Sequence, residues 1–229
     1  MKFGVVVFPG SNCDMDMVYV LETLHKQEVV RLWHKDTNLQ EVDFVILPGG
    51  FSYGDYLRSG ALAKISPIMK EVIGFANAGG YVMGICNGFQ ILTESGLLPG
   101  ALLNNTSHKF ICKNTHIKAV TQHSLITSKY LDKPITIPIA HAEGRYYANK
   151  ETLKLLSDND QIIFQYCDSM GNTTNDINPN GSLMNIAGIC NKERNVFGMM
   201  PHPERASDSE LNNEDGKLLF ESILNGFSS

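Results

Sequence analysis

The sequence lacks the features that would assign it to several broad classes of protein. None of its 229 residues belongs to an apolar run long enough to span a bilayer. The net charge of −5 is not accompanied by a basic block, which argues against a nucleic-acid partner. Met1-Lys2 leads at once into the apolar segment Phe3–Phe8, which is typical of a first strand rather than of a signal peptide.

Cysteine and nucleotide-binding signals are also sparse. The five cysteines lie at positions 13, 86, 112, 167 and 190, and no two of them form a Cys-x-x-Cys pair. An odd number at this spacing argues against a disulfide framework and a thiolate metal site, and it suits a reducing cytoplasm. No Gly-x-x-x-x-Gly-Lys-Ser/Thr loop is present. We therefore expect no metal and no cofactor in this chain.

The length, together with a composition that does not change along the chain, predicts one domain over residues 1–229. A chain of this size can bury a sizeable core, and we find no repeat, low-complexity tract or linker that would mark a second domain.

The first hundred residues alternate apolar strands with helical patterns. The predicted strands are Phe3–Phe8, Val29–Trp33, Phe44–Leu47 and Tyr81–Ile85. The predicted helix boundaries are a cap at Ser11 or Asn12, a start at Ser66-Pro67 and a stop at Gly79-Gly80. Continuous apolar strands that alternate with helices indicate a parallel sheet covered on both faces, with right-handed crossovers.

The rest of the chain has more strands and fewer helices. Residues 102–140 show no clear helical period, and we interpret them as a strand-rich section that forms a small antiparallel extension. Strands are predicted at Thr115–Thr121, Ile135–Ala140, Ile162–Cys167, Asn185–Cys190 and Val196–Met200. The Gly-, Asn-, Asp- and Pro-rich segment Asp168–Leu183 is predicted to be a loop, and Asp215–Leu224 a final helix.

A candidate nucleophile lies in Gly84-Ile85-Cys86-Asn87-Gly88, between the strand at 81–85 and a helical pattern. A strand that turns this sharply into a helix needs residues without Cβ beside the tip, and it forces the tip into a strained, exposed conformation. The helix N-terminus favours the thiolate form of Cys86. The alternative is a buried structural cysteine, since free cysteines are among the most buried residues.

A cysteine nucleophile needs a base and a group that orients the base. His202 follows an apolar strand directly, and Glu204 is two residues further on, close enough to hold its imidazole. The alternative is a surface histidine and glutamate in a proline-rich turn.

Acyl transfer also needs backbone N–H groups for the oxyanion. The first candidate is Gly50, in the Pro48-Gly49-Gly50 turn that ends the third strand, and the second is Asn87, the residue after the nucleophile. Because glycine peptides flip easily, the Gly50 donor is predicted to point away until a partner fixes it, which would make the isolated chain slow. The alternative for Pro-Gly-Gly is an ordinary turn.

The Cys86, Gly50 and His202 motifs together resemble a class I, triad-type glutamine amidotransferase. Longer motifs resemble the glutaminase subunits of phosphoribosylformylglycinamidine synthase nearly end to end, with residues 114–134 the least family-like section. These motifs are Pro9-Gly-Ser-Asn-Cys-Asp14, Leu47-Pro-Gly-Gly-Phe-Ser-Tyr-Gly-Asp-Tyr-Leu-Arg-Ser-Gly60, Gly96-Leu-Leu-Pro-Gly100, His141-Ala-Glu-Gly-Arg145, Asn178-Pro-Asn-Gly181 and Gly198-Met-Met-Pro-His-Pro-Glu-Arg205.

The resemblance implies a flavodoxin-like three-layer α/β/α fold with a mostly parallel sheet. It implies that Cys86, His202 and Glu204 form the catalytic triad. The glutamine contacts that it implies are Phe51, Gln90 and His141. It also implies partners: a synthetase subunit, which would bind ATP and Mg²⁺ and amidate formylglycinamide ribonucleotide, and a small accessory subunit.

Three rival interpretations stay open from sequence. The first is a cysteine hydrolase or redox sensor on the same fold, in which a histidine commonly follows the cysteine where Asn87 stands here. The second is a binding module that keeps the elbow as a relic, against which the intact Cys86, His202 and Glu204 argue. The third is a glutaminase that serves another synthetase.

Overall fold

The computed structural model describes residues 1–121, 123–130 and 133–227. By its internal packing the chain divides into two compact units. The first comprises Met1–Leu98 and Asn195–Gly198, and the second comprises Pro99–Arg194 and Met199–Ser229. The single domain predicted over residues 1–229 stays a prediction.

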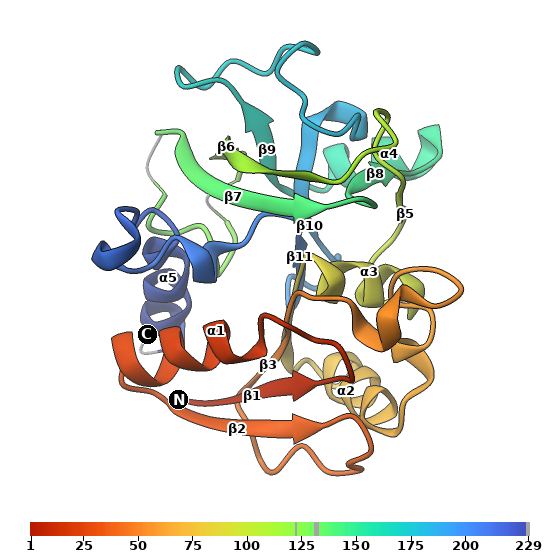
Figure 1. The fold of residues 1–229 in the computed structure, drawn as a ribbon, viewed down its shortest axis with the longest axis vertical. Helices are drawn as coiled ribbons and strands as arrows, with labels where there is room; N and C mark the ends of the chain where they lie inside the picture. The colour runs from red at the N-terminus through yellow and green to blue at the C-terminus, as the bar shows by residue number, and fades with distance from the viewer. Residues whose placement is uncertain (122, 131–132, 228–229) are drawn as a thin grey trace. The chain divides into compact units, whose positions relative to one another are not determined.

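The first unit is built on parallel strands, as the sequence predicted (Figure 1). Their order is β2 (Glu28–Trp33), β1 (Lys2–Val7), β3 (Phe44–Leu47), β4 (Tyr81–Ile85) and β11 (Val196–Met199), of which residues 196–198 belong to this unit. The pairs β1–β2, β1–β3 and β3–β4 are all parallel. Every residue of β3 is buried, which explains why its sequence shows no polar alternation.

The register of β3 and β4 decides where the loops of the first unit begin. Phe44 pairs with Tyr81 and Leu47 pairs with Gly84, so both strands end at the same level. Stacked rings hold the opposite ends of the strands together, because Phe44 and Phe197 both stack on Tyr81, with ring centroids 6.1 and 6.5 Å away. The loop after β3 and the turn after β4 are therefore neighbours.

Helices of the first unit pack on these strands. α1 (Asp14–Val18), which continues as the π-helix η1 (Tyr19–Leu24), contacts β1, and α2 (Pro67–Asn77) contacts β4. α3 (Asn87–Glu94) contacts both β3 and β4 (Figure 1). Two 3₁₀ turns, η2 (Ser52–Asp55) and η3 (Ala63–Ile65), lie in the segment between β3 and α2.

The predicted boundaries of α2 are confirmed, and the predicted cap of α1 is wrong. α2 begins at Pro67 with Ser66 as its N-cap, and Gly79 follows its end with a φ of +92°. The N-cap of α1 is Cys13 rather than Ser11 or Asn12, because the Ser11 hydroxyl is bound to the main chain of Phe8.

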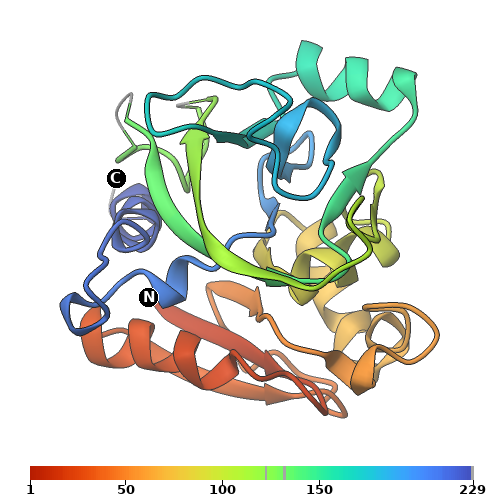
Figure 2. The ribbon, with the colours of Figure 1, turned by 45° about the horizontal axis from the view of Figure 1, so that its top comes forward.

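The second unit contains the predicted antiparallel extension. Its strands run in the order β10 (Ile186–Cys190), β9 (Ile162–Cys167), β6 (Ile111–Ala119) and β7 (Ile135–His141), and each neighbouring pair is antiparallel. Figure 2 shows β6 and β7 as two long curved strands side by side. Buried and half-buried residues alternate along β7, as expected for a sheet with one covered face. A separate antiparallel pair joins β5 (Ala101–Leu103) to β8 (Arg145–Tyr147).

The sequence analysis missed one helix of this unit, α4 (Lys150–Asp158). Only Leu156 of this short, mostly polar helix is buried, so few apolar residues mark it in the sequence. Its cap was the available signal, because the Asn149 side chain accepts a hydrogen bond from the Thr152 N–H at 2.8 Å. The predicted loop at Asp168–Leu183 is confirmed up to η4 (Leu183–Asn185). The predicted last helix is α5 (Lys217–Phe227).

Two 3₁₀ turns complete the second unit, η5 (Pro203–Arg205) and η6 (Ser209–Leu211). Within the least family-like section, positions 122, 131 and 132 lie outside the described residues. No helix in the described part of the chain combines the length and apolarity needed to cross a bilayer.

We expect opposite effects from alanine at two helical glycines of the first unit. A Cβ at Gly88 would lie 1.9 Å from the Leu47 carbonyl oxygen, whereas a Cβ at Gly74 meets nothing within 4 Å. Gly88→Ala should therefore destabilise the protein at the upper end of the ~1–3 kcal/mol typical of overpacking. Gly74→Ala should stabilise it by ~0.5–1 kcal/mol, because alanine loses less backbone entropy in a helix. Urea unfolding of both variants checks this, and equal stabilities would contradict it.

Candidate active site

Cys86 occupies the strained turn that the sequence predicted. It is the N-cap of α3, directly after β4, with φ 51° and ψ −104°. A residue with a side chain adopts this conformation only at a cost of ~1–3 kcal/mol, and such strain concentrates at functional sites. The flanking glycines make the turn possible, since a Cβ at Gly84 would lie 2.5 Å from the Gly88 carbonyl group. The turn has the geometry of a nucleophile elbow.

The predicted exposure of the tip is wrong. Cys86 is only 5% exposed. Local backbone geometry decides the direction in which the thiol leaves the turn, but its accessibility depends on everything that packs around the tip. Burial alone therefore does not separate a catalytic from a structural cysteine here, and the strained φ is the informative observation.

The loop after β3 presents a backbone donor at Gly50. The neighbouring main-chain groups are engaged, because Gly49 C=O accepts from the Cys13 N–H at 3.3 Å and the Phe51 N–H donates to Gly10 C=O at 2.8 Å. The N–H of Gly50, where φ is +133°, has no hydrogen-bond partner among the described residues. The N–H of Asn87 at the start of α3 has none either within that part of the chain. Both predicted oxyanion donors are thus available, as the chemistry requires.

The Asn87 side chain joins the elbow to this loop. It is 1% exposed, and its Oδ1 accepts from the Ser52 N–H at 3.1 Å. Its Nδ2 donates to Gln90 Oε1 at 2.9 Å. Gln90 is therefore a buried neighbour of the elbow, whereas Phe51 in the same loop is 45% exposed. Their predicted contacts with glutamine stay predictions.

In the second unit His202 and Glu204 form a buried pair. Nδ1 of His202 lies 2.6 Å from Oε1 of Glu204, and the two residues are 2% and 3% exposed. The main-chain N–H of His202 donates to Pro138 C=O of β7 at 2.9 Å, which anchors the turn. A carboxylate only accepts, so Nδ1 carries the proton and Nε2 is the nitrogen that can exchange a proton with a substrate. The alternative of a surface turn is wrong.

His141 ends β7 and is held as a neutral imidazole. Both Nδ2 protons of buried Asn105 go to main-chain oxygens, those of Lys109 and His141, so Asn105 Oδ1 faces the imidazole as an acceptor. Nδ1 of His141 lies 3.1 Å from it and must carry the proton. Nε2 is then a buried acceptor with no partner among the described residues. Burial and the nearby His202 lower the pKa of His141 to about 4.

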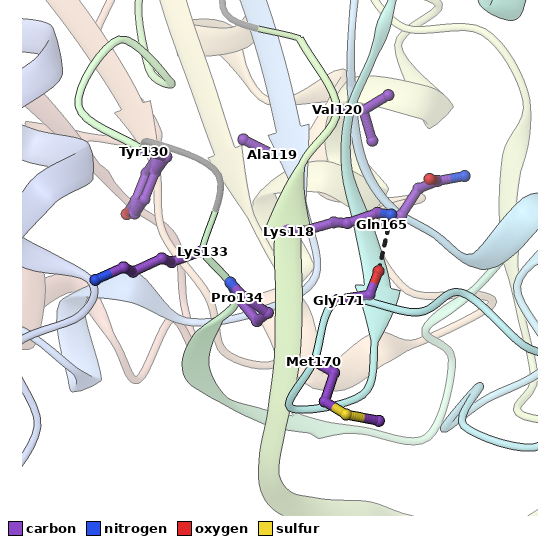
Figure 3. A pocket seen from close by; sticks show the side chains of 9 residues that line it. All are labelled: Lys118, Ala119, Val120, Tyr130, Lys133, Pro134, Gln165, Met170 and Gly171. Atoms are coloured by element: carbon purple, nitrogen blue, oxygen red, sulfur yellow. Dashed lines mark hydrogen bonds between the residues drawn. The ribbon is translucent and has the colours of Figure 1, made fainter.

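A pocket of about 360 Å³ in the second unit contains none of the predicted site residues. Figure 3 shows its lining, in which the Lys118 ammonium donates to Gly171 C=O at 2.9 Å. The polar groups of Tyr130 and Gln165 are also engaged, with the Asp215 and Met184 carbonyl oxygens. With these groups already paired, we assign the pocket no role in catalysis.

Comparison with known proteins identifies the class and then the family. The family model described as a CobB/CobQ-like glutamine amidotransferase domain matches residues 1–220, so the chain belongs to the class of glutamine amidotransferases. The phosphoribosylformylglycinamidine synthase subunit PurQ of Acaryochloris marina is 55% identical over 226 residues, 98% of this chain and 96% of that protein. The PurQ subunit from Synechocystis is 55% identical over 220 residues, 96% and 98% of the two chains. The chain belongs to the PurQ family.

A solved structure confirms the predicted fold class. A chain in the structure of PurLQS from Thermotoga maritima is 43% identical, with a TM-score of 0.86, and the match covers 99% of this chain and 98% of that one. A glutamine amidotransferase from the same organism matches at a TM-score of 0.59 with 14% identity, over 98% and 90% of the two chains, and shares the fold alone.

The pKa of His141 predicts a stability that falls in acid. The unfolded chain binds a proton at this residue near pH 6.5 and the folded chain only near pH 4, so the stability is present above 6.5 and lost as the pH falls toward 4. At pH 5.0 the loss from this one group should be about 2 kcal/mol. His141→Asn should remove it, so the variant loses less stability than the native chain between pH 7.5 and 5.0 in urea unfolding. His108→Asn, at an exposed position, should keep the full loss; identical pH profiles for both variants would contradict the assignment.

Proposed function

We propose that this chain hydrolyses glutamine and supplies the ammonia to a synthetase subunit. In that complex, ATP would drive the conversion of formylglycinamide ribonucleotide to formylglycinamidine ribonucleotide in de novo purine biosynthesis. Near full-length identity of 55% to phosphoribosylformylglycinamidine synthase subunits supports the assignment. The observation that carries it is the strained elbow at Cys86, which has two unpaired backbone N–H groups in the same unit.

Cys86 is the nucleophile in the proposed mechanism. Its thiolate attacks the side-chain carboxamide carbon of glutamine, and the carbonyl oxygen becomes an oxyanion. The N–H groups of Gly50 and Asn87 stabilise that oxyanion, each donor being worth ~2.7–4 kcal/mol of barrier. Collapse of the tetrahedral intermediate breaks the C–N bond, releases ammonia and leaves a glutamyl thioester on Cys86.

His202 transfers the protons and Glu204 orients it. With Nδ1 bound to the Glu204 carboxylate, Nε2 takes the thiol proton and delivers it to the departing nitrogen. In the second half of the reaction, Nε2 of His202 takes a proton from the water that attacks the thioester, and glutamate leaves. The buried carboxylate stabilises the imidazolium that forms in both halves.

Three further residues are proposed to hold glutamine. Gln90 and Phe51 belong to the elbow helix and the loop beside it. His141 offers a neutral Nε2 lone pair, so the group that it binds must be a donor, such as the amino or amide N–H of glutamine. A histidine with a pKa near 4 keeps this acceptor role throughout the physiological range.

The proposed partners are a synthetase subunit and a small accessory subunit, in agreement with the solved PurLQS assembly of the Thermotoga relative. ATP and Mg²⁺ would bind to the synthetase, and this chain would hold no metal or cofactor. Its five thiols, none of them in a disulfide, fit the cytoplasmic location that we propose. Tyr56 and Leu57, which are 69% and 77% exposed in the loop after β3, are the side chains that we propose for docking.

Cys86→Ser should abolish glutamine-dependent synthesis by the reconstituted complex, because the thiolate is needed for hydrolysis only. Synthesis from free ammonia should continue at the native rate. Cys112→Ser, at an exposed cysteine of β6, is the matched control and should change neither activity. Loss of the ammonia-dependent rate in Cys86→Ser would contradict this division of labour. Glutamate release without amidation of the acceptor would instead favour another synthetase.

A glutamine-like electrophile such as a chloroketone should label Cys86 before any other cysteine. Burial raises the pKa of the Cys167 and Cys190 thiols to about 11, which leaves them almost wholly protonated at neutral pH. Cys112 is exposed and is the competitor for unspecific alkylation. Peptide mass spectrometry after limited labelling checks this, and protection by glutamine should be confined to Cys86. Preferential modification of Cys13 or Cys112 would count against the site.

A further inference from the structure

We infer that the loop between β1 and α1, residues 8–13, acts with the Asn87 side chain as a frame that positions the Gly50 N–H for the oxyanion. This inference rests on the proposed function and concerns how its oxyanion donor is held. Residues 8–13 contain most of a sequence motif, Pro9–Asp14, to which neither the triad nor the glutamine contacts assign a role. The frame and the donor that it holds all belong to the first unit.

The frame binds three successive peptide groups of the loop after β3. The peptide that ends in the Gly50 N–H is held by Cys13 N–H, which donates to Gly49 C=O at 3.3 Å. The next is held by Gly10 C=O, which accepts from the Phe51 N–H at 2.8 Å. The third is held by Asn87 Oδ1, which accepts from the Ser52 N–H at 3.1 Å. The Gly50 N–H is the one main-chain donor of the three residues that is left without a partner within the described part of the chain.

The first of these bonds sets the direction of the Gly50 N–H. In a planar trans peptide the C=O and N–H groups point in opposite directions. Because Gly49 C=O points at Cys13, the N–H of Gly50 points away from Cys13. An unpaired backbone donor costs free energy unless a ligand satisfies it, so a frame that keeps this donor unpaired favours an acceptor from outside the chain.

The frame accepts only glycine at two facing positions. A Cβ at Gly10, where φ is +86°, would lie 2.4 Å from the Phe51 carbonyl oxygen. A Cβ at Gly50 would lie 2.4 Å from the Asn12 nitrogen. The hydroxyl of Ser11 braces the loop from inside, because it accepts from the Phe8 N–H at 3.1 Å and donates to Phe8 C=O at 2.9 Å. The two motifs, residues 9–14 and 47–60, therefore fit each other as backbone surfaces.

The frame also restrains any reorientation of the Gly50 N–H by a partner protein. The sequence predicts that the Gly49–Gly50 peptide flips until a partner fixes it. In the structure such a flip must break the Cys13–Gly49 hydrogen bond, so a partner that gates the donor has to act on residues 8–13 as well. The long 3.3 Å distance makes this bond the weakest of the three.

Gly10→Ala tests the frame, because its methyl group would meet main-chain atoms of Phe51 and Gly54 rather than a catalytic side chain. In the reconstituted complex we expect the glutamine-dependent kcat to fall by ~100-fold, the loss typical of a misplaced oxyanion donor, with KM for glutamine within about threefold. Ammonia-dependent synthesis should not change. Gly54→Ala is the matched control, since Gly54 lies in the same loop at φ +65° with nothing within 4 Å of its Cβ. It should keep the native kcat within about threefold.

Alkylation of Cys86 by iodoacetamide separates positioning from general damage. The sulfur displaces iodide from a saturated carbon, so no oxyanion forms and no donor is needed. Gly10→Ala should therefore be alkylated at the native rate although its glutaminase activity is lost. Asn87→Ala, which keeps the backbone N–H but releases Ser52, should behave in the same way, and it replaces Gly10→Ala if that variant does not fold.

The outcomes distinguish this inference from the proposed function. Native kcat in both variants, or an equal fall in alkylation and hydrolysis, would overturn the frame. A fall in Gly54→Ala as large as in Gly10→Ala would overturn it too, because strain anywhere in the loop would then suffice. Full glutaminase activity in Cys86→Ser would instead refute the proposed function.

Discussion

The strained turn at Cys86 depends on one close approach, that of α3 to the end of β3. Gly88 lies so near the Leu47 carbonyl that no side chain fits between them. This contact lets the helix begin immediately after β4, and Cys86 absorbs the change of direction in a conformation that ordinary residues avoid. The strained conformation is maintained because buried residues of β4 precede the turn and the buried start of α3 follows it.

In the proposed mechanism the same unit supplies the electrostatic stabilisation through its backbone. Neither proposed oxyanion donor is a side chain, so nothing titrates and few rotamers need to be ordered at the moment of reaction. The conformational cost of placing these N–H groups falls on the loops that hold their peptide groups. Gly10 and Gly50 accept positive φ values, and Asn87 is buried as a neutral amide with both of its ends satisfied.

The second unit contains two buried imidazoles to which we propose different roles, and their hydrogen-bond partners differ. His202 faces the Glu204 carboxylate, which fixes the orientation of its imidazole. His141 faces an amide oxygen and lies near His202, and burial keeps it neutral. His202 is anchored to β7 at Pro138, and His141 ends the same strand, so the proposed acid–base group and the proposed fixed acceptor lie on one strand with separate roles. Asn105, which the sequence analysis did not single out, fixes the nitrogen of His141 that carries the proton.

Apolar periodicity and glycine placement in the sequence determined much of this protein. They predicted the parallel strands of the first unit, the ends of α2, an antiparallel extension within residues 102–140 and the elbow at Cys86, because these depend on local sterics and on burial along one strand. The tertiary structure alone decided the rest. The burial of Cys86 and His202, the tautomer of His141, the cap at Cys13 and the contacts of Gly50 all depend on residues distant in sequence. Asn105 meets His141 at the end of β7 within the second unit, and the Gly10–Cys13 loop meets Gly50 where β1 and β3 pair within the first unit. No local pattern in the sequence encodes either contact.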